Sequence, residues 1–313
     1  MNEMLGGISM ELLLREIIEK NRHWTSFGKV ATYIPELSNV NPDILGIALV
    51  DKDGQLYKAG DYDSKFTLQS VSKPITLMLA LMDCGQEQVF EKVGMEPTGD
   101  PFNSMRKLET INPSKPLNPM INAGAIVVTS LIKGNSNQEK LNRILDTFKT
   151  ISNNPKLEIN ENVYLSEKKT GDRNRAMAYF LRDVGILEGD VEDILDLYFK
   201  QCSIEVDCID MANMGMFLAN QGMLKSGKQL VPKHITQMIK TFMVTCGMYD
   251  ESGEFAMNVG IPSKSGVGGG IMCAVPNRMG IGVVGPALDK KGNSVAGVKV
   301  LKTLSEQLSL SIF

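Results

Sequence analysis

Apolar runs separated by turn residues occur near both ends of this 313-residue chain. Near the N-terminal end, residues 44–61 (ILGIALVDKDGQLYKAGD) place two strand-like runs around Asp53-Gly54, a pair that favours a type I′ hairpin turn. Near the other end, IMCAV (271–275) and MGIGVVG (279–285) flank the turn-forming residues Pro276-Asn277-Arg278. We therefore expect an antiparallel sheet built from both chain ends.

Most of the sequence between these runs has helical periodicity instead. Four segments carry apolar residues three and four positions apart, and several begin with Ser or Asp and end with Gly. These segments are residues 136–151, 172–185, 190–202 and 207–222. Two further helices are predicted at the termini, one from Leu12, Leu13, Ile17 and Ile18, and one from Ser294 as a cap to about Leu308.

The pattern predicts an α+β fold in a single catalytic domain, 1–313. A sheet-containing subdomain would span about 1–80 and 256–313, flanked by helices. A helical subdomain, about 81–255, would be inserted between the two parts. A cleft where the subdomains meet is the usual place for a small-molecule site.

Composition excludes several classes of protein. The net charge is −3, and lysines are scattered without a basic stripe, which argues against a nucleic-acid or acidic-membrane partner. No apolar run approaches the roughly 20 residues that span a bilayer. The N-terminal residues include early acids and no signal-peptide cleavage pattern, so we expect a cytoplasmic protein.

Cysteine and histidine usage limits the possible chemistry. The five cysteines have no metal-ligand spacing, so buried reduced thiols are expected, with no metal and no cofactor. They are Cys84, Cys202, Cys208, Cys246 and Cys273. The two histidines, His23 and His234, lie in no catalytic motif. Hydrolytic chemistry here would need a base other than histidine.

The candidate nucleophile lies in FTLQSVSKP (66–74). Ser-x-x-Lys occurs five times, but only at Ser70 does it open a strongly apolar helix. Ser70 and Lys73 share a helix face, whereas Ser72 and Lys73 point about 100° apart. Pro74 is tolerated only in a first turn, which places the helix start near Ser70. From this motif alone, a Ser70 that only caps the helix is the stronger alternative.

A second element, SKSGVGGGI (263–271), places Lys264-Ser265-Gly266 and three more glycines directly before a strand. Glycines this dense allow close backbone approach to a ligand, although a flexible turn would look the same. A phosphate-binding loop is excluded because the lysine precedes the glycines. An N-terminal Ser-x-x-Lys with a C-terminal Lys-Ser-Gly resembles the β-lactamase and penicillin-binding-protein arrangement.

Six blocks in order sharpen this resemblance: GKVATYIPELSNVNPD, FTLQSVSKP, NPMINAGAI, SEKKTGDRNRAMAYFL, LYFKQCSIEV and SKSGVGGGI. Together they resemble the serine-dependent glutaminase family, over a stretch from about Gly28 to the last strand. The resemblance implies a β-lactamase/transpeptidase-like fold, hydrolysis of L-glutamine to L-glutamate and ammonia, no cofactor, and a homodimer or homotetramer.

The resemblance also implies roles for particular residues. Ser70 is the expected nucleophile, Lys73 its general base, and Tyr198 an active-site tyrosine that relays or donates a proton. The N–H groups of Ser70 and Val267 would form an oxyanion hole. The positions matching the family's substrate-binding residues are Ser70, Asn122, Glu167, Asn174, Tyr198, Tyr249 and Val267, with Tyr33 lining the pocket.

These residue types suit glutamine. Glu167 can pair with the substrate ammonium, while Asn122, Asn174 and Tyr249 can hold the α-carboxylate. To act as a base, Lys73 must lose its proton, which burial and a nearby cation such as Lys264 would both favour.

Alternative interpretations of the whole chain stay open. One is an amidohydrolase acting on another amino-acid amide such as asparagine, because a methylene is worth only about 1–3 kcal/mol. Another is a glutamine-binding protein without turnover, although Ser70 and Lys73 are both intact. A penicillin-binding protein or β-lactamase would need export.

Overall fold

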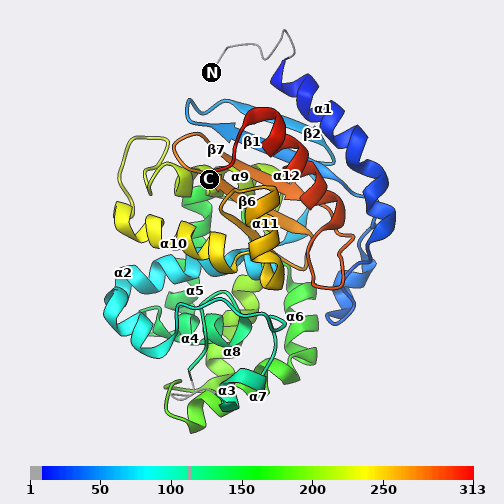
Figure 1. Ribbon diagram of the computed structural model, residues 1–313. Coiled ribbons are helices and arrows are strands. Elements are labelled where there is room, and N and C mark those ends of the chain that lie inside the picture. Colours follow the sequence, from blue (N-terminus) through cyan, green and yellow to red (C-terminus); the bar gives the residue numbers. More distant parts are fainter. Residues whose placement is uncertain (1–8, 111–114) are drawn as a thin grey trace.

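The computed structural model describes residues 9–110 and 115–313 and shows the predicted α+β fold (Figure 1). A five-stranded sheet built from both chain ends carries helices on both faces, and a mainly helical part extends below it. Residues 1–8, on which part of the signal-peptide argument rests, lie outside the described residues. No helix in the described ranges has the length and apolar character to cross a membrane.

The sheet has the strand order β2-β1-β7-β6-β5, with every neighbouring pair antiparallel. Its strands are β1 (Gly46–Asp51), β2 (Leu56–Gly60), β5 (Ser263–Ser265), β6 (Gly270–Val275) and β7 (Met279–Val284). N-terminal β1 pairs directly with C-terminal β7, with Ile47 opposite Val283. Both predicted strand pairs are therefore confirmed within one sheet.

The turn between β1 and β2 differs from the type I′ prediction. A type I′ turn needs positive φ at both central residues, but only Gly54 has one (φ 80°). The Gly54 N–H instead donates to the Asp51 carbonyl at 2.9 Å. The Asp51 carboxylate accepts the N–H groups of Asp53 and Gln55, both at 2.9 Å. These bonds stabilise a longer turn with a single left-handed glycine.

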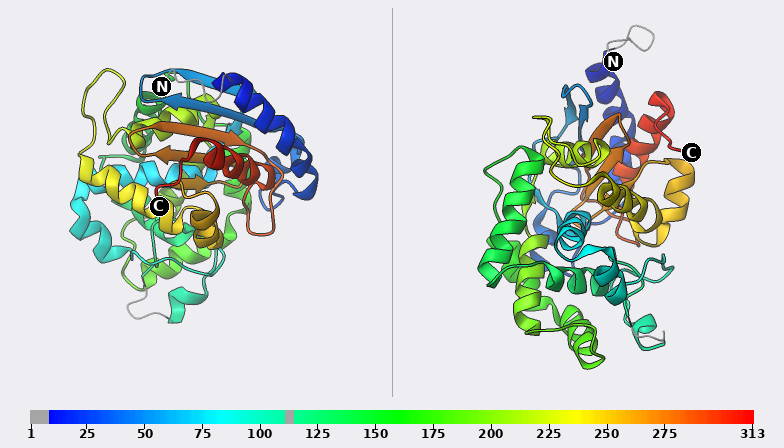
Figure 2. Two further views of the ribbon diagram at one scale, coloured as in Figure 1. Left: turned by 45° about the horizontal axis from the view of Figure 1, so that its top comes forward. Right: turned by 90° about the vertical axis from the view of Figure 1, so that its left-hand side faces the viewer.

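Helices α1 (Met10–Asn21) and α12 (Val295–Leu308) cover one face of the sheet (Figures 1 and 2). The apolar face predicted for the N-terminal helix was wrong in one detail. Leu12 is 47% exposed, and Leu14 packs in the core with Ile17 and Ile18 instead. The predicted cap is confirmed: Ser294 accepts the Gly297 N–H at 3.0 Å.

Helix α9 (Cys208–Ala219) packs on the opposite face, and glycines set its distance from the sheet. A Cβ added to Gly280 on β7 would lie 2.0 Å from the Met216 nitrogen of α9. A Cβ on Gly215 of α9 would lie 2.2 Å from the Cys273 carbonyl oxygen of β6. The glycines of MGIGVVG therefore permit direct backbone contact between helix and sheet.

Most of the remaining helices form the part of the molecule below the sheet in Figure 1, whereas the last of them, residues 252–258, packs against the core that α1 and α12 cover. They are α2 (Lys73–Lys92), α3 (Arg106–Thr110), α4 (Asn122–Leu131), α5 (Asn137–Ser152), α6 (Glu161–Thr170), α7 (Asp172–Asp183), α8 (Val191–Cys202), α10 (Lys233–Cys246) and α11 (Ser252–Asn258). The four segments predicted from periodicity correspond to α5, α7, α8 and α9. Because α9 packs on the sheet and the core continues from it into the helical part, the subdomain bounds stay a prediction.

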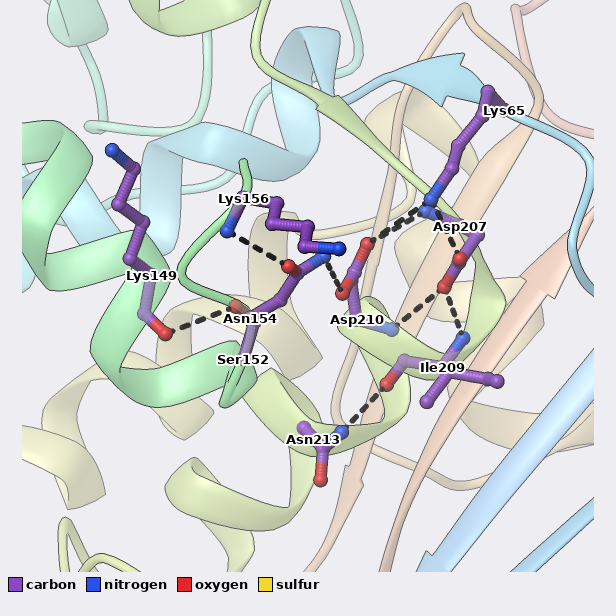
Figure 3. A network of polar contacts seen from close by, with 9 residues as sticks. All are labelled: Lys65, Lys149, Ser152, Asn154, Lys156, Asp207, Ile209, Asp210 and Asn213. Carbon is purple, nitrogen blue, oxygen red and sulfur yellow. Dashed lines mark hydrogen bonds and ion pairs between the residues drawn. The ribbon is translucent and has the colours of Figure 1, made fainter. Parts of the chain in front are cut away.

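In the described ranges, four short 3₁₀ helices connect these elements: η1 (Arg22–Phe27), η2 (Pro35–Asn39), η3 (Gln69–Ser72) and η4 (Tyr249–Glu251). A two-stranded ladder, β3 (Phe66–Thr67) with β4 (Glu205–Val206), leads directly into η3. A polar network anchors this ladder (Figure 3): Lys65 pairs with Asp207 at 2.7 Å, and Asp210 accepts from Asn154 at 2.9 Å. Asp207 and Asp210 also form the capping box of α9, so one network joins β3, β4 and α9.

Candidate active site

Ser70 lies in η3, at the junction between the ladder and α2. The α-helix itself begins at Lys73, three residues later than Ser70, so the predicted helix start is preceded by a 3₁₀ turn. Gln69 has a left-handed backbone (φ 48°), which is uncommon for a residue other than glycine. The Ser72 hydroxyl is fully buried and donates to the Gln69 carbonyl at 2.7 Å, so it holds this turn.

Lys73 is buried, and its side chain reaches the start of α4. Its Nζ donates to the Asn122 Oδ1 at 2.7 Å and to the Met120 carbonyl at 3.2 Å. Burial lowers the pKa of Lys73 to about 8, while nearby Cys202 and Glu167 oppose the shift. A neutral amine has two N–H donors, so both bonds survive deprotonation and leave the lone pair free to accept a proton.

Lys264 on β5 has no exposed surface. Its Nζ donates to the carbonyls of Gly247 (3.1 Å) and Ser265 (2.7 Å), and it lies 4.6 Å from the centre of the Tyr249 ring. Burial, followed by the charge of Lys73, lowers its pKa well below the ordinary value. Both buried lysines therefore lose their protons more readily than an exposed lysine. Burial, rather than a charge on Lys264, is the principal cause of the low Lys73 pKa.

The glycine-rich loop between β5 and β6 packs on the backbone that leads to Ser70. A Cβ on Gly266 would lie 2.6 Å from the Leu68 carbonyl oxygen, and one on Gly268 would lie 2.5 Å from that of Thr67. These glycines therefore let the loop pack closely on the protein's own backbone. The sequence had suggested that they let the loop approach a ligand. Val267, between them, is held beside the Ser70 turn.

Tyr249 begins η4 with a left-handed backbone (φ 54°), and its ring is buried. Burial raises the pKa of Tyr249, and the nearby Ser70 side chain and Val267 N–H oppose this rise. Its hydroxyl nevertheless has no hydrogen-bond partner of normal geometry within the described part of the chain. The Tyr249 phenol is thus close to Ser70 and available to a substrate.

Glu167 on α6 is a buried carboxylate whose Oε2 lacks a hydrogen-bond partner among the described residues. Burial raises the pKa of Glu167 to about 8, while Lys73 and a contact with Gln69 lower it. Such a carboxylate is costly to ionise until a cation reaches it. The arrangement suits a ligand that carries its own ammonium group.

Asn122 and Asn174 continue the polar wall of the site. The Asn122 Nδ2 donates to the Asn174 Oδ1 at 3.1 Å, while its Oδ1 accepts from Lys73. This bonding fixes the orientation of the Asn122 amide and leaves the Asn174 amide nitrogen available. Asn122 is the first residue of α4, and its side chain makes these tertiary bonds instead of capping the helix.

Tyr198 on α8 is 2% exposed and contacts the Cys202 thiol one helical turn later. Burial raises the pKa of Tyr198 well above its ordinary value, and the neighbouring Cys202 and Glu167 add to the rise. Sequence reasoning missed both Cys202 and Gln69. The spacing of Cys202 from Tyr198 and the position of Gln69 directly before Ser70 were signals that could have identified them.

Tyr33 differs from the other predicted residues because it is 50% exposed. It lines a cavity of about 450 Å³ together with Phe102 and Val267. Its hydroxyl end lies near Glu167 and Tyr249, which add to the rise that burial causes in the pKa of Tyr33. The ring therefore extends from this cavity to the interior of the site. Within residues 9–110 and 115–313, no group of three or more His, Cys, Asp or Glu side chains could hold a metal ion.

The geometry therefore combines a serine, a buried lysine of lowered pKa, a backbone N–H beside the serine, and an unpaired buried carboxylate. This set can support acyl transfer through a covalent serine intermediate on a substrate bearing an ammonium group.

Comparisons with known proteins agree with this chemistry. The model of the family described as Glutaminase matches residues 28–313. A glutaminase from Alkaliphilus oremlandii is 62% identical over 306 residues, covering 97% of this chain and 100% of the relative. One from Clostridioides difficile is 60% identical over 304 residues, covering 97% of this chain and 98% of the relative.

Solved structures show the same fold. A Bacillus glutaminase in the presence of 4.3 M NaCl has a TM-score of 0.91 and 40% identity, covering 97% of this chain and 100% of that one. A probable glutaminase from Bacillus subtilis, complexed with 6-diazo-5-oxo-L-norleucine, has a TM-score of 0.89 and 39% identity. That comparison covers 98% of this chain and 97% of the other.

Proposed function

This chain belongs to the glutaminase family, and on that premise we propose that it hydrolyses the side-chain amide of L-glutamine to L-glutamate and ammonia. The observation that carries the proposal is Ser70 in a tight turn beside Lys73, a buried lysine with a pKa lowered to about 8. The Bacillus subtilis relative supports the substrate class, because 6-diazo-5-oxo-L-norleucine is a glutamine analogue.

Substrate binding is proposed to begin at Glu167. The glutamine ammonium would pair with the unpartnered Glu167 carboxylate, which ionises as the cation arrives. The α-carboxylate would accept a hydrogen bond from the Asn174 amide, with Asn122 holding Asn174 in place. The Tyr249 hydroxyl, which lies beside Ser70, is kept for proton transfer at the side-chain amide. These contacts would leave the side-chain amide at Ser70.

In acylation, neutral Lys73 would take the Ser70 proton while Ser70 Oγ attacks the amide carbon. The N–H groups of Ser70 and Val267 would stabilise the oxyanion, each donor being worth about 2.7–4 kcal/mol. The C–N bond then breaks as the departing nitrogen takes a proton from the Tyr249 hydroxyl and leaves as ammonia. The Tyr249 oxygen regains a proton from Lys73, which is therefore neutral again before deacylation. The position of the Tyr249 phenol near Ser70 favours Tyr249 over Tyr198 for this proton delivery.

In deacylation, water would attack the γ-glutamyl ester and lose its proton to Lys73, and Ser70 would recover its own proton as the ester C–O bond breaks. Tyr198 is then proposed to orient the site through Cys202. Lys264 is proposed to support Tyr249 from beneath its ring. No step of this sequence calls on a metal or an organic cofactor.

The decisive experiment measures ammonia release from L-glutamine by the wild type, Ser70→Ala and Ser72→Ala, with L-asparagine and nitrocefin as control substrates. Glutamine-specific release that disappears only in Ser70→Ala would support the mechanism. Residual turnover in Ser70→Ala would overturn the nucleophile assignment, and preferential turnover of asparagine would replace the substrate.

We further propose a homodimer or homotetramer located in the cytoplasm. The family resemblance supports the assembly, and the five cysteines, all free, suit a reducing compartment. Light scattering after size-exclusion chromatography tests the assembly, and fractionation of cells producing the protein tests the location.

A further inference from the structure

A second cavity of about 300 Å³ lies between α11 and α12, separate from the residues assigned to catalysis. Met248 and Glu251, on either side of Tyr249 in the chain, contribute to its lining. Its apolar surface comes from Phe255 of α11, from Val259 directly after that helix, and from Val298 of α12. Phe255 and Val259 are buried in the core beneath the sheet, so this surface is part of the fixed interior.

Opposite charges face this apolar surface from the two helices. Glu251 and Glu254 lie three residues apart at the α11 side, and Lys299 and Lys302 lie three residues apart on α12. Residues at this spacing share a helix face. The cavity therefore has an acidic wall and a basic wall, with aliphatic and aromatic side chains contributing the rest of its surface.

The charges do not neutralise one another across the cavity. None of the ion pairs formed within residues 9–110 and 115–313 joins the acidic wall to the basic wall. Glu251 bonds to Asn293 at 2.7 Å and pairs with Lys291 at 3.5 Å, and Lys299 lies 4.8 Å from the centre of the Trp24 ring. Glu254 and Lys302 are then the charges best placed to meet a ligand from opposite sides.

A direct structural connection runs from this cavity to the active site. Asn293 is fully buried, and its Nδ2 donates to the Met248 carbonyl (3.3 Å) and to Glu251 Oε2 (2.7 Å). It therefore holds the chain on both sides of Tyr249, whose left-handed backbone needs such support. A ligand that contacts Met248 and Glu251 would shift or stiffen the turn that presents the Tyr249 phenol.

We propose that this cavity binds a short zwitterion with an ammonium and a carboxylate at the two ends of an aliphatic chain, and that the bound ligand changes the rate of the glutaminase reaction through Tyr249. The ammonium would meet Glu254 and the carboxylate would meet Lys302. The methylene chain would cover the apolar surface that includes Phe255 and Val298, and it would contact Met248 at the turn that presents Tyr249.

Isothermal titration calorimetry of the full chain with 5-aminopentanoate tests binding, with pentanoate and butylamine as probes that each carry one of the two charges. We expect saturable binding of 5-aminopentanoate, weakened about tenfold or more by Glu254→Gln and by Lys302→Gln, as for loss of one charge-assisted bond. Glu306→Gln, an exposed change on α12 outside the cavity, is the matched control. Absence of saturable binding, or binding that survives both cavity variants, would overturn the site.

Glutamine turnover then tests the connection, which rests on the proposed function. We expect 5-aminopentanoate to change kcat at saturating glutamine in the wild type and in Glu306→Gln but not in Lys302→Gln. A change in KM alone would indicate competition at the active site and overturn the inference, as would binding without any change in rate. Calorimetry does not depend on turnover, so a failed glutaminase assignment is distinguished from a failed binding site.

Discussion

Lys73 and Glu167 show how one buried environment adjusts two side chains in opposite directions. Burial disfavours the charged form of each, so the pKa of the lysine falls to about 8 and the pKa of the carboxyl rises to about 8. Each partly offsets the shift of the other by attraction. The base is thereby made available near neutral pH, and the carboxylate is kept for a cationic ligand.

The pH dependence of the reaction follows from Lys73. The base must be neutral, so kcat/KM is expected to rise with pH with a midpoint near the Lys73 pKa of about 8 and to be low at pH 6. Initial rates of ammonia release between pH 6 and 9 measure this profile, and Lys73→Arg should be inactive throughout. A flat profile over this range would contradict Lys73 as the base.

Glu167 should act mainly on substrate binding. Glu167→Gln removes the charge that pairs with the substrate ammonium, so KM for glutamine is expected to rise about 10- to 100-fold, as for loss of a charged hydrogen bond. Glu161→Gln, exposed on the same helix, is the control and should leave KM unchanged. An unchanged KM in the Glu167 variant would exclude the ammonium contact.

At the scale of elements, contact between α9 and the sheet depends on glycines, which have no side chain to separate the two backbones. Gly280, Gly282 and Gly215 bring the α9 backbone against β6 and β7, where any Cβ would overlap backbone atoms. Backbone atoms of a packed helix and sheet cannot give way as a flexible side chain can. The glycine spacing in β7 is therefore a packing requirement for this layer.

Gly280→Ala is accordingly expected to destabilise the fold by about 1–3 kcal/mol, the usual range for overpacking. The added Cβ would lie 2.0 Å from the Met216 nitrogen. Gly253→Ala in α11 is the matched control, because its Cβ would meet nothing within 4 Å and alanine favours a helix. Urea unfolding of both variants gives the comparison. Equal stability of the two would show that α9 can move away from the sheet.

At the scale of the whole molecule, the site is assembled from both parts of the chain. Val267, Lys264 and Tyr249 come from the sheet side, while Asn122 and Glu167 come from the helical part. A ligand that contacts both groups bridges them. Binding and the stability of the entire fold should therefore be coupled.

L-Glutamate, the proposed product, is expected to raise the unfolding temperature of the wild type and of Ser70→Ala. At about 100 times its Kd, it would add about 2.7 kcal/mol. Glu167→Gln should show a much smaller rise, because the ammonium contact is lost. Thermal unfolding with and without L-glutamate measures this, and an equal rise in Glu167→Gln would contradict the proposed binding mode.

Much of this molecule follows from local sequence pattern. The periodicities of α5, α7, α8 and α9, the Ser294 cap and both strand pairs were predicted, because side-chain spacing along a helix or strand is a local property. The six sequence blocks, in their order along the chain, predicted the family. The β1–β2 turn differs from the type I′ prediction. There the Asp51 carboxylate accepts backbone N–H groups and stabilises a longer turn.

The sequence by itself determined the elements, the family and the residue types of the site. Only the tertiary structure decided that Tyr249 lies against Ser70, and that burial lowers the pKa values of both Lys73 and Lys264. It also decided that the glycine-rich loop packs on residues 67–68. These features depend on burial and on contacts between residues about 180 to 200 positions apart. Spacing along the chain specifies which face a side chain occupies, but desolvation and neighbouring charges arise only when distant faces pack together.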